Sequence, residues 1–187
     1  MPEPAPMLEA RGALHGLTLP KREGLVAVVD AGPSARFSYR GDPRFADDAF
    51  GLTLPTDPCR ARVVGGLAAL WLGPDEWLLL APIAKHAECV RALRQAIVGR
   101  PASLVDISHG NSAVIVDGEG AARLLNAGCP LEFDLAAFPV GMCARTLFTK
   151  AEIVLWRTAA NTFRVELSRS FAPYMVGHLA IAIADID

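Results

Sequence analysis

Apolar residues occur in short runs separated by turn-forming residues. The clearest example is a pair of apolar runs, residues 67–72 and 77–81, that flank Gly73-Pro74-Asp75-Glu76. Proline presets the backbone angle of a tight turn, and aspartate can accept a hydrogen bond from its own turn. Pro82 ends the second run, and apolar residues then recur at three- and four-residue spacing over residues 86–98. The pattern predicts two strands joined by a turn and followed by a helix.

The same criteria predict elements along the rest of the chain. Strands are expected over residues 24–30, 36–40, 103–108, 112–117, 143–149, 152–158 and 161–167. Helices are expected over residues 44–50 and 121–127, and from Pro173 toward Ile183. Residues 1–23 are interrupted by proline, glycine and charge, which predicts a mobile N-terminal arm ahead of a single domain over residues 24–187.

The two halves of the chain repeat one pattern. Residues 37–41 align with residues 114–118, and Leu70-Trp71 aligns with Leu155-Trp156. Further along, Trp77 aligns with Phe163, and three apolar positions of each final helix coincide: Val90, Leu93 and Ile97 with Val176, Leu179 and Ile183. We therefore predict an α+β fold of two duplicated strand-helix-strand-strand-helix halves, about 24–99 and 102–187. The alternative is that apolar strands and helices align by chance.

The helices that end the two halves differ in polarity. The helix at residues 86–98 has a polar side, whereas the one at residues 173–184 is almost wholly apolar. A helix that is apolar all round is covered all round, either by the rest of its own fold or by another subunit. The sequence leaves both explanations open. The interface candidates are Tyr174, Met175, Leu179, Ile181 and Ile183.

Composition excludes several classes of protein. Hydrophobic residues make up 52% of the 187, the mean hydropathy is +0.31 and the formal net charge is -2. The chain lacks the excess of basic residues that is typical of nucleic-acid-binding proteins. No apolar run approaches the roughly 18 residues that a membrane helix needs. The N-terminus shows no export signal, and no two of the four cysteines have a metal or redox spacing. We expect a cytoplasmic protein with reduced thiols and no metal site.

Few residues are candidates for chemistry. Asp106 and His109 are close enough to form an acid–base pair or to orient a ligand, although residues at a strand end more often cap a turn. Gly118-x-Gly120-x-x-Arg123 is similar to a dinucleotide fingerprint without its third glycine, and the glycines are explained as well by a strand-to-helix turn. No serine or cysteine stands in a nucleophile motif. No catalytic residue is therefore assigned.

Arginines near the C-terminus are candidates for binding a carboxylate, because a guanidinium group matches it with two parallel hydrogen bonds. They are Arg145, Arg157, Arg164 and Arg169. Solvated strand edges would account for them equally well. Taken together, the pocket candidates are Asp106, His109, Arg145 and Arg169.

Several segments together resemble the gamma subunit family of heterotetrameric sarcosine oxidase. They are Trp71-Leu72-Gly73-Pro74-Asp75-Glu76-Trp77-Leu78-Leu79, Asp106-Ile107-Ser108-His109-Gly110, Gly120-Ala121-Ala122, Leu124-Leu125, Gly128-Cys129-Pro130-Leu131, Phe138-Pro139 with Gly141, Cys143-Ala144 and Thr146, and Arg169-Ser170-Phe171. The resemblance covers most of the chain and is weakest over residues 1–35. Such subunits usually have a longer helix in place of residues 41–51.

The resemblance implies a fold like the folate-binding domain of the glycine-cleavage T-protein, with two interlocked α+β halves. It also implies an accessory, non-catalytic chain without a cofactor of its own. Its partners would be the alpha, beta and delta subunits of an oxidase that demethylates sarcosine. That complex would use FAD, FMN, NAD and tetrahydrofolate on the other subunits. The alternatives are a free-standing folate or small-carboxylate binder, with Asp106, His109 and Arg145 lining a pocket, and an independent folate-dependent methyltransferase.

Overall fold

Two antiparallel sheets pack face to face, and helices cover the outer face of each. The computed structural model describes residues 12–186. Sheet A contains, in spatial order, β1 (Lys21–Arg22), β2 (Val26–Asp30), β8 (Asn111–Asp117), β11 (Thr162–Ser168), β10 (Ala151–Ala159) and β9 (Cys143–Phe148). Sheet B contains β4 (Ala61–Val64), β5 (Leu67–Gly73), β6 (Glu76–Pro82), β3 (Ser34–Arg40) and β7 (Ser103–Asp106).

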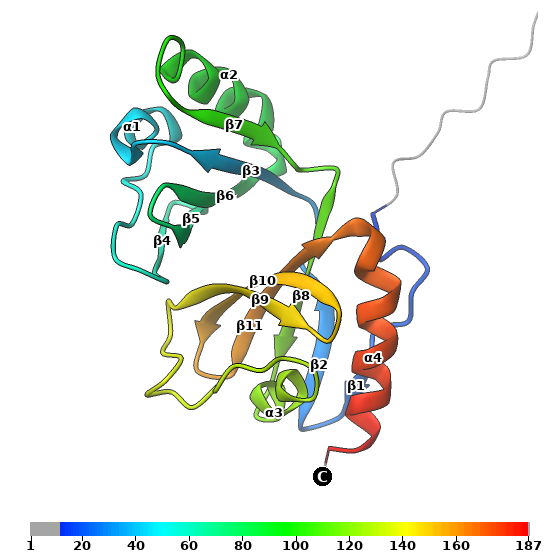
Figure 1. The fold of residues 1–187 in the computed structure, drawn as a ribbon. Coiled ribbons are helices and arrows are strands. Elements are labelled where there is room, and N and C mark those ends of the chain that lie inside the picture. Colours follow the sequence, from blue (N-terminus) through cyan, green and yellow to red (C-terminus); the bar gives the residue numbers. More distant parts are fainter. Residues whose placement is uncertain (1–11, 187) are drawn as a thin grey trace, which may run out of the picture.

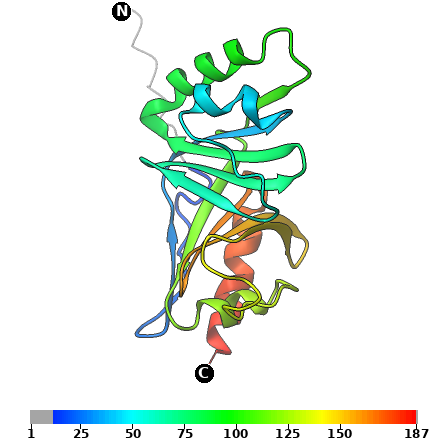
Figure 2. The same cartoon turned by 90° about the vertical axis from the view of Figure 1, so that its left-hand side faces the viewer.

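The helices form the two outer layers (Figures 1 and 2). Sheet B is covered by α1 (Asp47–Phe50) and α2 (His86–Ala96), and sheet A by α3 (Ala121–Asn126) and α4 (Ala172–Ala184). Three short turns of 3-10 helix precede α1, α2 and α4: η1 (Pro43–Phe45), η2 (Ile83–Lys85) and η3 (Arg169–Phe171). Separate apolar cores fill the two helix–sheet layers, and a third lies between the sheets.

The strands and helices expected from the sequence are confirmed, with ends that move by only a few residues. Two short strands, β1 and β4, were missed. In β4, Val63 and Val64 are both more than half exposed, so the strand shows no alternation of apolar and polar positions.

The duplication is visible in the strand order. The series β4-β5-β6-β3 in sheet B matches β9-β10-β11-β8 in sheet A, and each series is followed by a covering helix. Within the matched pairs, Phe37 lies opposite Leu79 on β3 and β6, and Val114 lies opposite Val165 on β8 and β11. Leu93 of α2 and Leu179 of α4 are both fully buried. The predicted α+β fold of two interlocked halves is therefore confirmed.

One detail of the predicted repeat, the alignment of Trp71 with Trp156, is wrong. Trp71 lies opposite Trp77, whereas the residue opposite Phe163 is Arg157, so the counterpart of Trp71 is Arg157 and not Trp156. Trp71 packs on the helix side of sheet B, and Trp156 packs between the two sheets. Successive side chains of a strand face opposite ways, so a shift of one residue exchanges the two faces.

The halves interlock by exchanging a strand. β2 precedes β3 in the chain but pairs with β8 in sheet A, and β7 precedes β8 but pairs with β3 in sheet B. The chain therefore passes from one sheet to the other between β2 and β3 and again between β7 and β8 (Figure 1). Neither half completes its own sheet.

Repeated glycines allow the exchanged strands to approach. Gly41 and Gly118 follow β3 and β8 with φ of 145° and 123°. A Cβ on Gly118 would lie 2.3 Å from the carbonyl oxygen of Leu25, just before β2, and a Cβ on Gly41 would lie 2.7 Å from Ala102, just before β7. The space that a dinucleotide would need beside Gly118 is therefore filled by the chain itself, which explains this motif as a strand-to-helix turn.

Residues 12–23 correct the prediction of a mobile arm over residues 1–23. Leu14 is buried in the core of sheet A and α4, and β1 pairs with β2. This segment packs because it carries an apolar side chain and extends sheet A. Residues 1–11 of the predicted arm lie outside the described residues.

The final helix α4 is central to the fold on one side only. Met175, Leu179 and Ile183 are at most 8% exposed and pack against sheet A, which corrects their assignment as interface residues. Ile181 is 67% exposed, and Tyr174 is half-buried. Of the two explanations left open by the sequence, burial within the chain holds for the inner side.

Ion pairs join the two sheets at both ends of β3. At one end, Glu76 of sheet B accepts hydrogen bonds from Arg40 at 2.7 Å and from Arg145 of β9 at 2.5 Å. At the other end, Arg36 of sheet B donates to Glu166 of sheet A at 2.5 Å, and both side chains are almost fully buried. Charged residues on facing sheets thus hold the sandwich together where the apolar layer ends.

We predict that Gly118→Ala destabilises the fold because it adds a Cβ where the backbone of Leu25 already lies and where φ is unfavourable. The free energy of unfolding should fall by about 2 kcal/mol or more. Gly177 in α4 has open space around it, so Gly177→Ala should raise it by about 1 kcal/mol. Urea unfolding followed by circular dichroism measures both. Equal effects of the two substitutions would contradict the strand-exchange explanation of Gly118.

We also predict that Glu76→Gln weakens the sandwich in a pH-dependent way. The hydrogen bonds from Arg145, against the effect of partial burial, hold the pKa of Glu76 below its ordinary 4.5. Its stabilising effect is thus complete above that value and lost as the pH falls below it. The variant should lose about 2 kcal/mol of unfolding free energy at neutral pH and approach the parent chain in acid.

Glu152→Gln is the matched control. Glu152 contacts the same Arg145 at 3.8 Å but is 72% exposed, so its removal should change the unfolding free energy by less than about 0.5 kcal/mol. Urea titrations at a series of pH values provide the comparison. A Glu76→Gln effect that does not vary with pH would contradict the ionic role of Glu76.

Candidate functional site

Two linkers carry the chain between the sheets, and they meet in the structure. Residues 31–33 lead from β2 to β3, and residues 107–110 lead from β7 to β8. Each follows an aspartate that accepts a hydrogen bond from the amide two residues on: Asp30 from Gly32 at 2.8 Å and Asp106 from Ser108 at 3.0 Å. Such Asx turns redirect the chain at the end of a strand.

The duplication relates the two linkers. Ala31 donates its amide to the carbonyl oxygen of Ala113, and Ile107 donates to that of Arg36, both at 3.0 Å. The pairs Val29-Asp30 and Val105-Asp106 are the corresponding signal in the sequence, which was missed. The hydroxyl of Ser108 also accepts a hydrogen bond from the backbone amide of Arg36 at 2.9 Å, which connects the second linker to β3.

A cavity of about 570 Å³ opens where the linkers meet. We call it the exchange cavity. It is lined by Gly12, Ala13, Asp30, Gly32, Pro33, Ser34, Arg36, Ile83, Ser108, His109, Asn111, Ser112 and Arg169. Two of the four predicted pocket residues, His109 and Arg169, therefore line the same cavity.

Asp106 has a structural role in the turn and does not form the expected pair with His109. Its carboxylate accepts hydrogen bonds from the amide and the hydroxyl of Ser108 and lies 2.6 Å from Nε2 of His86, at the start of α2. Partial burial acts to raise the pKa of Asp106, but the hydrogen bonds from Ser108 and His86 outweigh it and hold the pKa below its ordinary value. The turn-capping explanation is supported by these contacts, and His86 is a partner that sequence analysis missed.

Three of the four candidate arginines do not line the exchange cavity. Arg145 is held by Glu76 at the opposite end of β3 from the exchange cavity, which corrects its place among the pocket residues. Arg157 is buried and donates to the carbonyl oxygens of Phe133, Phe138 and Ala160, so it fixes the loop before β9. Arg164 donates to Glu166 at 2.7 Å.

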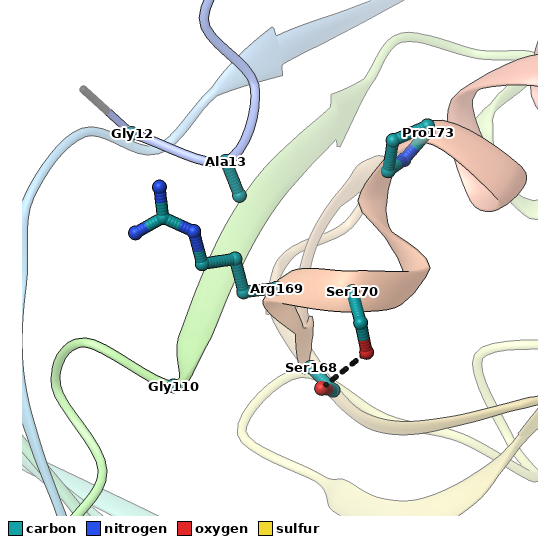
Figure 3. A pocket seen from close by; sticks show the side chains of 7 residues that line it. All are labelled: Gly12, Ala13, Gly110, Ser168, Arg169, Ser170 and Pro173. Atoms are coloured by element: carbon teal, nitrogen blue, oxygen red, sulfur yellow. Dashed lines mark hydrogen bonds between the residues drawn. The ribbon is translucent and has the colours of Figure 1, made fainter.

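Arg169 is the fourth, and it lies at the exchange cavity. Its backbone amide donates to the carbonyl oxygen of Gly110 at 2.8 Å, which joins the start of η3 to the second linker. Its side chain extends from η3 toward Gly12 and Ala13 (Figure 3). These residues also line an adjoining hollow of about 540 Å³. Arg169 therefore lies beside the second linker and lines the exchange cavity.

Arg36 is the cavity residue that sequence analysis missed. It alternates with Ala35 and Phe37 on β3, and a polar position in such a pattern is usually a solvent-facing one. Here the second sheet covers that face, and Arg36 is 2% exposed. Nothing local in the sequence reveals the covering sheet.

The cysteines and the helices give no metal site and no membrane-spanning segment in the described chain. All four cysteines are free, and burial raises the pKa of the Cys143 thiol to about 12, so this thiol is held in its neutral form. Among residues 12–186, no three acidic, histidine or cysteine side chains gather as metal ligands would. None of the helices in that range has the length and apolar character to cross a membrane.

Known proteins share the fold. The chain is similar to one chain of the heterotetrameric sarcosine oxidase from Corynebacterium sp. U-96, solved in complex with pyrrole 2-carboxylate. The TM-score is 0.85 at 26% identity, over 94% of this chain and 95% of that one. The glycine cleavage aminomethyltransferase T from Bartonella henselae shows the same fold at 14% identity, with a TM-score of 0.62 over 83% of this chain and 45% of that chain. The expected T-protein-like fold is confirmed.

Sequence comparison gives the family. The gamma subunit of sarcosine oxidase from Corynebacterium sp. (strain P-1) is 32% identical over 125 residues, which is 67% of this chain. The matched region spans 61% of the length of that relative. The model of the family described as "Sarcosine oxidase, gamma subunit family" matches residues 39–185. The chain therefore belongs to the sarcosine oxidase gamma subunit family.

Proposed function

We propose that this chain is an accessory subunit of a heterotetrameric sarcosine oxidase. The observation that carries the proposal is the backbone match along almost the whole of both chains to a component of such an oxidase. The match extends over 94% of this chain and 95% of that one. A chain with the same shape can occupy the same place in a complex.

The contacts of the polar residues support a structural role. Asp106 caps a turn, Arg145 and Glu76 join the sheets, and Arg157 fixes a loop. Residues held in this way position the fold and are not available to a substrate. In this proposal the chain supplies no catalytic residue and holds no cofactor of the oxidase reaction.

The remaining components follow from the same proposal. The partners would be the alpha, beta and delta subunits, in the cytoplasm. FAD, FMN, NAD and tetrahydrofolate would be bound by those subunits. Oxidative demethylation of sarcosine would then take place outside this chain.

The outer side of α4 is the surface we propose for contact with another subunit. No acidic, lysine or arginine residue occurs between Ala172 and Ala184, and Ile181 on the outer side is 67% exposed. Tyr174 lies on the same helix, half-buried, with its hydroxyl bonded to Thr149 at 2.9 Å. A helix face without charge is a usual feature of a protein interface.

Co-expression tests the assembly role. A tagged beta subunit is expressed with alpha, delta and this chain, and the purified complex is analysed for protein composition and flavin absorbance. We expect this chain in equal amount with the other subunits in the flavin-containing fraction. Its exclusion from that fraction would refute the proposal.

Ile181→Asp tests the proposed surface. A charge on the outer side of α4 would be buried without a partner on assembly, so we expect about a tenfold or greater loss of this chain from the purified complex. Val98, which is 77% exposed beyond α2, gives the matched control Val98→Asp, and we expect it to leave assembly unchanged. Circular dichroism verifies that both variants are folded. Full assembly of Ile181→Asp would show that this face is not the interface.

A further inference from the structure

Two cysteines lie opposite each other at a backbone contact that joins the two sheets. Arg60, just before β4 of sheet B, forms an antiparallel bridge with Met142, just before β9 of sheet A. At the next position along this bridge, the amide of Cys143 donates to the carbonyl oxygen of Cys59 at 2.9 Å. Cys59 and Cys143 are therefore direct neighbours across the bridge, although they are distant in the sequence.

The backbone spacing at this bridge suits a disulfide. Residues directly opposite each other in an antiparallel pair have Cα atoms about 4.5 to about 5.5 Å apart. Disulfides join residues whose Cα atoms are about 4.4 to about 6.8 Å apart. The thiol of Cys59 also interacts electrostatically with that of Cys143 and adds to the effect of burial in raising the pKa of Cys143. The two thiols are thus near each other, as their backbones are.

Cys59 has a backbone conformation that residues with a side chain rarely adopt. Its φ is 58°, and among the described residues Thr149 is the one other non-glycine residue with a positive φ. Glycine would adopt this conformation without strain. Strained positions of this kind cluster at functional sites, and what a cysteine adds at such a position is a reactive thiol.

The two thiols differ in exposure. Cys59 is half-buried, whereas Cys143 is fully buried and its Sγ donates to the carbonyl oxygen of Trp71 at 3.5 Å. The thiolate is the reactive form of cysteine, and burial raises the pKa of Cys143 to about 12, so Cys143 is protected from direct oxidation. An oxidant in solution therefore reaches Cys59 first, and Cys143 is placed to react with the oxidised Cys59.

We propose that Cys59 and Cys143 form a reversible disulfide when the chain is exposed to hydrogen peroxide. In the first step the sulfur of Cys59 attacks a peroxide oxygen. The O–O bond breaks, an S–O bond forms, and the departing hydroxide leaves as water with the thiol proton. In the second step the sulfur of Cys143 displaces the hydroxyl group of this sulfenic acid, which leaves as a second water with the proton of Cys143. Two thiols are oxidised to one disulfide, and the peroxide is reduced to two waters.

The disulfide links sheet B covalently to sheet A. It closes a long segment of chain, from residue 59 to residue 143, and such a cross-link stabilises a fold mainly by restricting the unfolded chain. In a reducing compartment both thiols are normally free, and a disulfide formed there is usually transient and redox-sensing. This proposal is independent of the assembly role, since it concerns the chain alone.

Mass spectrometry of the full chain tests the proposal. The reduced chain is treated with excess hydrogen peroxide, the remaining thiols are alkylated, and the tryptic peptides are analysed. We expect an intramolecular link between the peptides of Cys59 and Cys143 that dithiothreitol reverses, while Cys89 and Cys129 are alkylated. Alkylation of both Cys59 and Cys143, a sulfinic acid at Cys59, or a link from Cys59 to a second copy of the chain would each overturn the proposal.

Substitution of Cys143 tests its reaction with the oxidised Cys59. In Cys143→Ser the sulfenic acid of Cys59 has no thiol to react with, so its labelling by dimedone should exceed that of the parent chain by about tenfold or more. Cys129, buried in the core of sheet A, gives the matched control, and Cys129→Ser should form the disulfide as the parent does. Equal dimedone labelling of Cys143→Ser and the parent chain would overturn the proposal. If Cys143→Ser failed to fold, the peptide analysis of the parent chain would still decide it.

Urea unfolding tests whether the bond fits the native fold. We expect oxidation of the parent chain to raise the urea midpoint by about 1 M or more, and dithiothreitol to return it to the reduced value. Cys59→Ser should show no such change. A midpoint that oxidation leaves unchanged or lowers would show that the bond distorts the sheets, and it would overturn the proposal.

Discussion

The exchange of β2 and β7 between the two sheets is the constraint on which the rest of the structure depends. Each sheet is completed by a strand that comes from the other half of the chain. The repeated glycines Gly41 and Gly118 give the exchanged segments room, and Asp30 and Asp106 turn the chain after them. The two sheets are therefore held face to face by the course of the backbone itself.

Face-to-face packing explains where the charged residues lie. Alternate positions of β3 and β11 point into the space between the sheets, and some of them are arginine and glutamate. Such charges are tolerated in a buried layer when they are paired. Pairing with the opposite sheet uses Arg145 and Glu166, and Arg164 pairs with Glu166 on the same strand. The outer side of α4 carries no such charge, and it is the surface that we propose for contact with another subunit.

The local elements could be predicted because their signals are local. The turn at Gly73-Pro74, the spacing of apolar residues in α2 and α4, and the repeated glycines all identified elements that the structure contains. The exchange could not be predicted, because β2 is adjacent to β3 in the chain and adjacency favours pairing between neighbours. The partner of Gly118 is Leu25, a contact between distant residues that no spacing in the sequence reveals.

The candidate site was predicted only in part, because it too depends on contacts between residues that are distant in the sequence. His109 and Arg169 line the exchange cavity, but Arg36 was not among the candidates because the sheet that covers it is formed by the other half. Arg145 and Asp106 were selected by residue type, and the structure gives them partners that depend on sheet packing. The outer side of α4 could be separated from its inner side only once the covering sheet was known.

Native-state hydrogen exchange with increasing urea tests the central claim, that strand exchange makes the two sheets one cooperative unit. The amide of Ala31, just after β2, donates to the carbonyl oxygen of Ala113 and reports on sheet A, and the amide of Ile107, just after β7, donates to that of Arg36 and reports on sheet B. The account predicts that both exchange only through one opening with the same free energy and the same dependence on urea. Opening of one sheet at a clearly lower free energy than the other would contradict it.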